Sequence, residues 1–300
     1  MIKTSGFYDL CIEESFFSKG DVEKSIKSLY DYGYRTIAVN QTIEDGNLEP
    51  KKKKKKGEVR EVQEPVPLPY DLLPIKTVIR TLNLVNFQVF NRLTIEFVNQ
   101  DGLNKITKSP NYRKYQIVAA SPTTNQALSY TCNNFDADIF TFNPENKFGL
   151  RLNRKLYNQL LQRGYHFELL YSPAIEDTTK RKNLIHASHL YHAFGKSRNI
   201  IFSSGAHDSV VIRGPYDVIN FGFLFGLSEI QCKTAVSYCP HKVVINSVGR
   251  RHGKAIMFVE NIPHEQEKTI ATADINVAVD IDDDDDDTET DQPKQKKTKV

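Results

Sequence analysis

Short apolar segments alternate with amphipathic helical segments along most of the chain. Strands are predicted at residues 7–12, 36–40, 93–98, 117–120, 138–142, 167–171 and 200–203. Helices are predicted at residues 21–32, 123–133, 152–162 and 178–194. An apolar strand followed by an amphipathic helix forms a right-handed βαβ unit, so this order predicts an α/β protein with a parallel sheet. Seven such units over about 250 residues favour a closed barrel of seven to eight strands, although residues 228–247 look helical throughout and contain no recognisable eighth strand.

The carboxyl end of the seventh predicted strand has unusually small side chains. The apolar residues 200–202 are followed by Ser-Ser-Gly-Ala at positions 203–206, and a basic loop then leads to Arg213. Gly214-Pro215 predicts the start of an apolar helix, and Ser228 with Gln231 has the spacing of a capping box. Small side chains let a ligand or another backbone approach closely, so this edge of the barrel is a candidate site.

Two segments have a composition that does not suit a packed core. Residues 41–69 contain six consecutive lysines, Lys51 to Lys56, and near their end Pro65, Pro67 and Pro69, which predicts a disordered insertion. Residues 261–300 form an acidic and then basic tail, also predicted to be disordered. The sequence thus predicts a single barrel domain over residues 1–260, interrupted by the insertion.

The charge and cysteine content narrow the class of protein. The formal net charge of +3 combines the lysine run with the acidic tail, which leaves the rest of the chain close to neutral. Any nucleic-acid contact must therefore come from local basic patches. The four cysteines have no Cys-x-x-Cys spacing, and no apolar run approaches the roughly 18 residues of a membrane span. These features predict a soluble, reduced, intracellular protein that makes no membrane contact.

Histidines raise the question of a metal site. His186, His189 and His192 recur on the long predicted helix, but no carboxylate or cysteine accompanies them there. His207 follows the small-residue strand end, where metal ligands and general bases of barrel enzymes lie. The polar residues at the other predicted strand ends are Asp9, Cys11, Glu13, Asn40, Glu96, Ser121, Asn143 and Ser172. Because a metal needs three or four ligands and no second histidine is among them, we expect no metal site and no catalytic residue.

The triplet Gly195-Lys196-Ser197 is similar to the end of a phosphate-binding P-loop. The motif requires a glycine five positions earlier, where this chain has Leu190. The triplet also ends a helix and leads into a strand, which is the reverse of the P-loop order. The sequence therefore predicts no P-loop here.

Basic clusters are the remaining signal for a polyanionic partner. Lys180, Arg181 and Lys182 lie in the first turn of a predicted helix, where positive charge is slightly unfavourable. Arg213 precedes the Gly-Pro helix start, and Arg250 and Arg251 follow the last helical pattern. We therefore predict that these six residues contact RNA.

Several motifs together resemble a known family. They are FYDL at residues 7–10, ELLYSPAI at 168–175, SSGA at 203–206, IRGPYDV at 212–218, LFGLSE at 224–229 and AVS at 235–237. In this order they resemble the 30-kilodalton protein subunit shared by ribonuclease P and ribonuclease MRP, over about residues 5–255. IRGPYDV and LFGLSE are the most specific part of the resemblance. The lysine-rich insertion and the acidic tail lie outside it.

The resemblance implies a TIM-like barrel related to the PHP phosphoesterases. Those enzymes bind metal ions through a His-x-His motif on the first strand, where this chain has Cys11 and Glu13. His207 is what remains of the late metal-binding turn, with Gly205 in place of its acid. The resemblance thus implies a scaffold that has lost the ancestral enzyme activity.

The implied function is that of a non-catalytic subunit supporting the RNA-catalysed removal of the 5′ leader from precursor tRNA. Expected partners are ribonuclease P RNA, ribonuclease MRP RNA and other protein subunits, including a small α/β protein. Magnesium ions are expected on the catalytic RNA and no cofactor on this chain, and the expected location is the nucleus and nucleolus. Two alternatives are a metal-dependent PHP-type phosphoesterase that retains its own activity, and a protein-binding scaffold without RNA contact.

Overall fold

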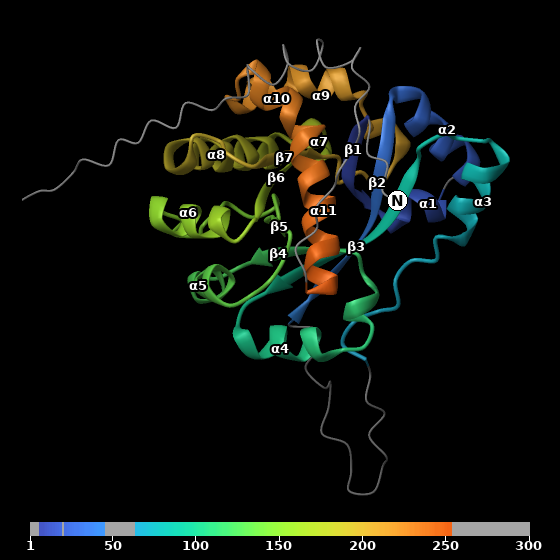
Figure 1. Ribbon diagram of the computed structural model, residues 1–300. Helices are drawn as coiled ribbons and strands as arrows, with labels where there is room; N and C mark the ends of the chain where they lie inside the picture. The colour runs from blue at the N-terminus through green and yellow to red at the C-terminus, as the bar shows by residue number, and fades with distance from the viewer. Residues whose placement is uncertain (1–5, 20, 46–63, 254–300) are drawn as a thin grey trace, which may run out of the picture. The chain divides into compact units, whose positions relative to one another are not determined.

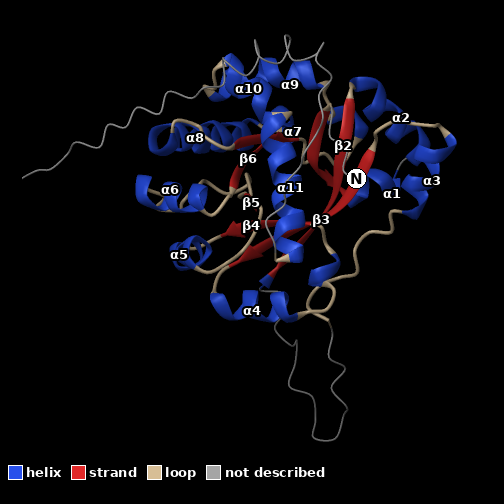
Figure 2. Cartoon of the chain, in the orientation of Figure 1, coloured by secondary structure: helices blue, strands red, loops and turns tan. Residues whose placement is uncertain are grey.

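A parallel β-barrel forms the centre of the computed structural model, which describes residues 6–19, 21–45 and 64–253 (Figures 1 and 2). All neighbouring strands are parallel and follow one another in chain order. The strands are β1 (Phe7–Glu13), β2 (Tyr34–Glu44), β3 (Gln88–Phe97), β4 (Ile117–Pro122), β5 (Ile139–Phe140), β6 (His166–Leu170) and β7 (Ile200–Ser203). The predicted α/β barrel is therefore confirmed.

Helices surround these strands (Figure 2). They are α1 (Glu14–Lys19), α2 (Val22–Tyr32), α3 (Leu73–Thr81), α4 (Gln100–Lys108), α5 (Asn125–Asn133), α6 (Arg154–Gln162), α7 (Tyr171–Glu176), α8 (Thr178–Gly195), α9 (Pro215–Gly222), α10 (Glu229–Ala235) and α11 (Tyr238–His252). Short 3₁₀ turns η2 (Tyr112–Lys114), η3 (Ser209–Val211) and η4 (Phe223–Phe225) connect some of them. In the part of the chain that the structure describes, no helix is both long and apolar enough to cross a membrane.

The barrel closes without an eighth strand in the described residues. At the carboxyl ends of the strands, the Gly205 amide donates to the Cys11 carbonyl at 2.7 Å, and the Glu13 amide donates to the Ala206 carbonyl at 3.0 Å. At the opposite end, the Tyr8 amide donates to the carbonyl of Val236, which connects α10 to α11. The helical segment thus takes the place that an eighth strand would occupy beside β1.

Helix α11 forms the floor of the barrel at the amino-terminal ends of the strands. It runs across the strands in Figure 1, and Val243 and Val244 pack into the barrel interior. The interior residues that they join are Tyr8, Leu10, Ala38, Ile117, Ala119, Ile139 and Ile201. This lower half of the interior is therefore an apolar core.

An ion pair fixes α11 in this position. Arg250 donates from Nε to Asp138 Oδ1 at 3.0 Å and from Nη2 to Asp138 Oδ2 at 2.8 Å. Nη2 also donates to the Gln116 carbonyl at 2.9 Å, so one guanidinium contacts the start of both β4 and β5. The Asp138 side chain is 2% exposed and that of Arg250 17% exposed, so water screens the pair weakly.

Several boundary predictions are confirmed and others are wrong. The seventh strand, the Gly214-Pro215 helix start and the Ser228–Gln231 capping box lie where the sequence predicts them. The predicted insertion at 41–69 is too wide, because β2 continues to Glu44 and Val66 is fully buried in the outer core. Residues 228–247 are not helical throughout, because the chain leaves helical geometry at Ser237. Residues 46–63, with the lysine run, and the predicted tail at 261–300 lie outside the described residues.

Replacing Arg250 with alanine should destabilise the protein by about 3 kcal/mol, because removal of one partner leaves the buried Asp138 carboxylate uncompensated. Urea unfolding followed by circular dichroism measures the change. Arg251 is the matched control, since it is the exposed next residue on the same helix, and Arg251→Ala should change stability by less than about 0.5 kcal/mol. Equal effects of the two variants would contradict this role of Arg250.

Candidate functional site

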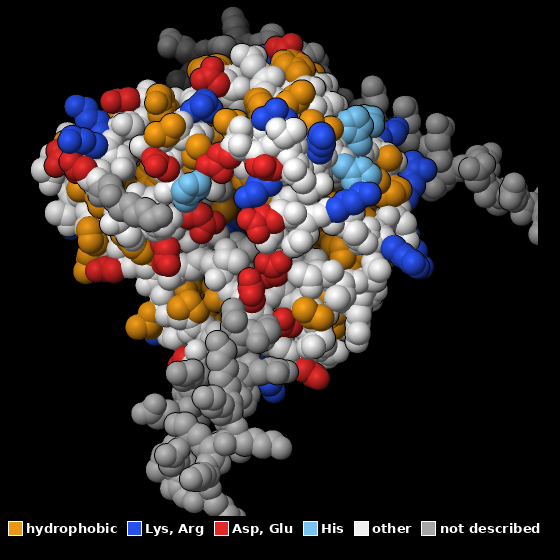
Figure 3. All heavy atoms as spheres, turned by 180° about the vertical axis from the view of Figure 1, so that it is seen from behind, with side chains coloured by type: hydrophobic (Ala, Val, Ile, Leu, Met, Phe, Trp, Pro, Cys, Tyr) orange, Lys and Arg blue, Asp and Glu red, His pale blue; other side chains and the backbone are white. Residues whose placement is uncertain are grey.

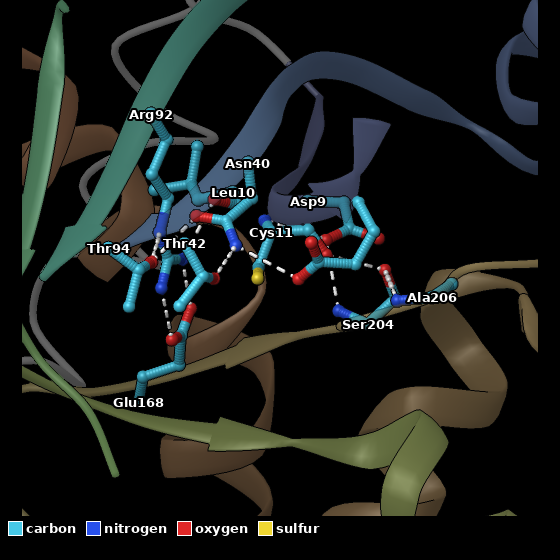
Figure 4. A network of polar contacts seen from close by, with 11 residues as sticks. Asp9, Leu10, Cys11, Asn40, Thr42, Arg92, Thr94, Glu168, Ser204 and Ala206 are labelled. Carbon is cyan, nitrogen blue, oxygen red and sulfur yellow. Dashed lines mark hydrogen bonds and ion pairs between the residues drawn. The ribbon is translucent and has the colours of Figure 1, made fainter. Parts of the chain in front are cut away.

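The upper half of the barrel interior contains a polar network instead of an apolar core (Figure 4). Arg92 of β3 makes a two-pronged ion pair with Glu168 of β6, with Nη1–Oε1 and Nη2–Oε2 distances of 2.5 and 2.6 Å. Nη1 also donates to the Leu10 carbonyl of β1 at 2.8 Å. Both side chains of the pair are at most 1% exposed. The guanidinium thus connects three strands inside the barrel.

Strand geometry explains why Arg92 lies in the interior. Alternate residues of a strand point to opposite faces, and Leu93 and Ile95 pack in the outer core. Arg92 and Thr94 therefore face inward. Strands β4 and β5 separate β3 from β6 in the sheet, so the ion pair between Arg92 and Glu168 must cross the barrel interior.

Hydrogen bonds extend the network toward the carboxyl ends of the strands. The Arg92 Nε donates to Thr94 Oγ1 at 3.3 Å, and the Thr94 hydroxyl donates to Asn40 Oδ1 at 2.6 Å. The Asn40 amide then donates to Glu13 Oε1 at 2.9 Å and to Thr42 Oγ1 at 3.1 Å. The chain of contacts satisfies side chains from four strands, as a buried polar network requires.

Asp9 fixes the seam between β1 and β7. Its Oδ1 accepts hydrogen bonds from the Cys11 amide at 3.2 Å and the Ser204 amide at 3.0 Å, and its Oδ2 has no partner among the described residues. The Ser204 hydroxyl donates to the Cys11 carbonyl at 2.9 Å. Burial raises the pKa of Asp9 to about 6, although the bonds from Ser204 and Cys11 oppose the shift. Asp9 is 1% exposed, so a substrate does not reach it.

The chemistry of these groups does not suit catalysis or metal binding. Burial raises the pKa of the Cys11 thiol well above its usual value, so the nucleophilic thiolate is absent at neutral pH. Burial also raises the pKa of Glu13. The carboxylate oxygens of Glu168 bind the Arg92 guanidinium and are not free to bind a metal ion. Within residues 6–19, 21–45 and 64–253, no three His, Cys, Asp or Glu side chains are placed to hold a metal.

The other polar residues predicted at the strand ends lie outside this network. His207 is about half exposed, and its Nδ1 is 3.7 Å from Glu176 Oε1 at the end of α7. Glu96, Ser121 and Asn143 line a small pocket of about 130 Å³ at the ends of β3, β4 and β5. Ser172 is buried, and its amide donates to the Ser204 carbonyl at 3.0 Å. The structure therefore brings together Asp9, Cys11, Glu13 and Asn40 but does not complete a catalytic centre with His207.

Of the six predicted RNA contacts, four make intramolecular bonds. Lys180 pairs with Glu145 at 3.1 Å, and Arg181 Nε donates to the Ala174 carbonyl at 2.6 Å. Arg213 Nη1 donates to the carbonyls of Val210 and Ile212, and Arg250 pairs with Asp138. Lys182 and Arg251 are exposed. The face in Figure 3 carries acidic, basic and apolar side chains intermingled, and the role of all six residues as RNA contacts stays a prediction.

The sequence did not predict a larger pocket beside Arg213. It has a volume of about 430 Å³ and is lined by Tyr171, Ile175, Arg213, Asp217, Val218 and Phe221. Large apolar side chains are exposed in the same segment of the chain, at Val210, Tyr216, Phe223 and Leu224. We call this pocket and these four residues the α9 surface. Its mainly apolar character is typical of a protein-binding surface.

Comparison with known proteins gives consistent matches over the barrel. The family model described as RNase P subunit p30 matches residues 6–252. The chain is 31% identical to the ribonuclease P protein subunit p30 of Mus musculus, covering 78% of this chain and 84% of that protein. It is 23% identical to the ribonuclease P/MRP protein subunit RPP1 of Saccharomyces cerevisiae, covering 77% of this chain and 73% of that protein. A cryo-EM structure of archaeal ribonuclease P with mature tRNA contains a chain of the same fold, with a TM-score of 0.59, 14% identity, and coverage of 86% of this chain and 99% of that one.

Removing one partner of the interior ion pair should destabilise the folded protein strongly, whereas replacing both partners should destabilise it little. We expect Arg92→Met to destabilise the protein by about 3–5 kcal/mol, because Glu168 is left buried without a counter-charge. The double variant Arg92→Met/Glu168→Leu should recover most of this loss, since it removes both desolvated charges. Chemical denaturation of the single and double variants tests the coupling. Additive losses in the double variant would contradict it.

Asp9 should make stability depend on pH in a defined direction. Its pKa rises from 3.8 to about 6 on burial, so the protonated carboxyl favours the folded state below pH 3.8, and this contribution is lost as the pH rises through about 6. The stability of the wild type relative to Asp9→Asn should therefore fall by about 3 kcal/mol between about pH 4 and about pH 7. Burial lowers the pKa of His166 to about 4, so His166 makes stability rise with pH. This contribution is the same in the wild type and in Asp9→Asn, so it cancels in the difference between them. A difference that does not change with pH would contradict the assignment to Asp9.

Proposed function

The chain belongs to the ribonuclease P subunit p30 family and is therefore a protein subunit of an RNA-based endoribonuclease; we propose that it supports removal of the 5′ leader from precursor tRNA without performing the chemistry. The interior of its barrel carries this proposal. In the half of the barrel interior that adjoins the strand ends where barrel enzymes place their catalytic groups, Arg92 and Glu168 neutralise one another. This arrangement favours a scaffold, and no observation on the described residues favours a phosphoesterase that retains its own activity.

We propose that the RNA partners are ribonuclease P RNA and ribonuclease MRP RNA, with a corresponding role in both tRNA and rRNA processing. A relative named as a subunit of both ribonucleoproteins supports the second RNA. The magnesium ions would be held by the RNA, and the protein would neutralise phosphates with local cations, because its body is close to neutral. The proposed location is the nucleus and nucleolus.

We further propose that the α9 surface binds another protein subunit, with the small α/β protein among the proposed partners. An exposed group of large apolar side chains beside a pocket suits the insertion of a partner side chain better than it suits a phosphate backbone. Arg213 and Asp217 at the pocket supply one charge of each sign to orient the partner. Exclusion of water from Phe223 and Leu224 would then contribute to binding.

Purification of the tagged full-length chain from its own cells, followed by sequencing of the bound RNA, tests the function. We expect ribonuclease P RNA and ribonuclease MRP RNA to be enriched at least ten-fold over a purification with an unrelated tagged protein. Recovery of neither RNA would contradict the proposal.

The same purification tests the protein contact. Phe223→Glu places a charge on the α9 surface and should remove at least one co-purifying protein subunit. Leu68→Glu is the matched control, because Leu68 is similarly apolar and exposed but lies outside the α9 surface. Identical protein recovery with the two variants would contradict docking at this surface.

A further inference from the structure

The turn between α8 and β7 is held in an unfavourable backbone conformation. Lys196, Ser197 and Asn199 have φ angles of 51°, 56° and 55°, which lie in the left-handed region. Side chains with a Cβ adopt this region at a cost that glycine avoids, and asparagine tolerates it better than lysine or serine. Lys196 occupies the C-cap of α8, where helices that end in this conformation usually have glycine. A turn that only had to connect α8 to β7 would be easier to build with glycine at this position.

The surrounding structure holds the turn from several sides. A Cβ on Gly195 would lie 1.8 Å from the ring of Tyr157 on α6, so only glycine fits there. The Tyr157 hydroxyl donates to the Arg198 carbonyl at 2.7 Å, and its ring stacks on Phe167 at 4.0 Å. Strain persists in a folded protein only where neighbouring contacts impose it, and such strain concentrates at functional sites.

Two further side-chain hydrogen bonds connect the turn to its neighbours. Gln231 of α10 donates from Nε2 to the Lys196 carbonyl at 2.9 Å. Asn199 donates from Nδ2 to the Tyr165 carbonyl at 3.1 Å. Helix α6, helix α10 and the start of β6 therefore all contribute to the geometry of a single five-residue turn.

The result of this geometry is a pair of cations on the surface. Lys196 and Arg198 are exposed, whereas Ser197 between them is buried. Arg198 Nη2 donates to Asn158 Oδ1 at 3.1 Å and its Nε donates to the Gly195 carbonyl at 3.3 Å, which orients the guanidinium. The exposed His192 one turn earlier on α8 lies beside the turn, with its Nδ1 3.3 Å from the Ser197 hydroxyl. A fixed arginine beside a lysine is a suitable pair for successive phosphates.

We propose that the turn Gly195–Asn199 is an RNA-backbone contact, in which Lys196 and Arg198 bind phosphodiester oxygens independently of sequence. The inference rests on the proposed function, because it assumes an RNA partner, and it assigns a contact that the basic clusters of the sequence do not include. It also gives the lysine at this strained position a role. RNA is favoured over an acidic protein, since no large apolar side chain is exposed within the turn to anchor a protein interface.

Binding of the full-length chain to a ribonuclease P RNA transcript, measured by filter retention over a series of salt concentrations, tests the proposal. The double variant Lys196→Gln/Arg198→Gln should bind at least five-fold more weakly at about 0.15 M salt. It should also lower the magnitude of the slope of log K against log salt by about 1 to 2, because each phosphate contact contributes about 0.9. Lys24→Gln/Lys27→Gln is the matched control, because both lysines are exposed on α2, on the other side of the barrel from α8 (Figure 1).

Two glycine variants separate the RNA contact from a structural role. Lys196→Gly removes both the strain and the cation, so it should raise the thermal midpoint while weakening RNA binding. Ser197→Gly relieves strain at a buried neighbour and should leave RNA binding unchanged. Wild-type affinity and salt slope in Lys196→Gly and in the double variant would overturn the proposal, and so would an equal loss in the Lys24/Lys27 control. A wild-type protein that binds no ribonuclease P RNA at all would instead contradict the proposed function.

Discussion

The ion pair between Arg92 and Glu168 is the interaction on which the rest of the structure depends. It lies inside the barrel, where the loss of hydration would make two unpaired charges strongly destabilising. The two parallel hydrogen bonds between guanidinium and carboxylate compensate both charges at once. The same guanidinium contacts β1 through the Leu10 carbonyl and reaches β2 through Thr94 and Asn40. Strands that are distant in the sheet are thereby held in one register. Enzymes of barrel fold bind substrate at the carboxyl ends of the strands, but here the network that starts at this ion pair extends to Glu13 at the end of β1.

The small-residue segment after β7 has a related explanation. Ser203 to Ala206 first suggests the edge of an active site, because small side chains permit close approach. In the structure the group that approaches is the backbone of β1, which bonds to Gly205 and Ala206 and closes the barrel. Gly205 has a φ of 64° and lies against the Leu170 side chain, so a larger residue would be strained there. The pattern correctly predicts a close contact but does not reveal whether a ligand or another strand makes it.

The sequence predicted the elements that depend on local patterns and missed the contacts between distant ones. The strand at Ile200–Ser203 and the helix cap at Ser228 follow from short-range chemistry and were found. Two strands, β4 and β5, lie between the strands of Arg92 and Glu168 in the sheet, and three helices, α4 to α6, lie between them along the chain, so no local pattern pairs them. Two helices were also missed. Helix α3 follows the segment that looked like a disordered insertion, and helix α4 follows the third strand. The roles of basic residues were equally hard to predict, because half-buried Arg250 and exposed Arg251 are adjacent and chemically identical.

The most direct test of the scaffold account is the activity of ribonuclease P reconstituted with a barrel that lacks the interior ion pair. The protein carrying Arg92→Met and Glu168→Leu keeps its surface and loses only this interior ion pair, provided that circular dichroism shows it folded. Cleavage of precursor tRNA should then proceed with a kcat/KM within about two-fold of the wild-type holoenzyme, since the account places no reacting group in the barrel. A fall of a hundred-fold or more in a folded, assembled complex would contradict it and would assign the barrel interior a part in the chemistry.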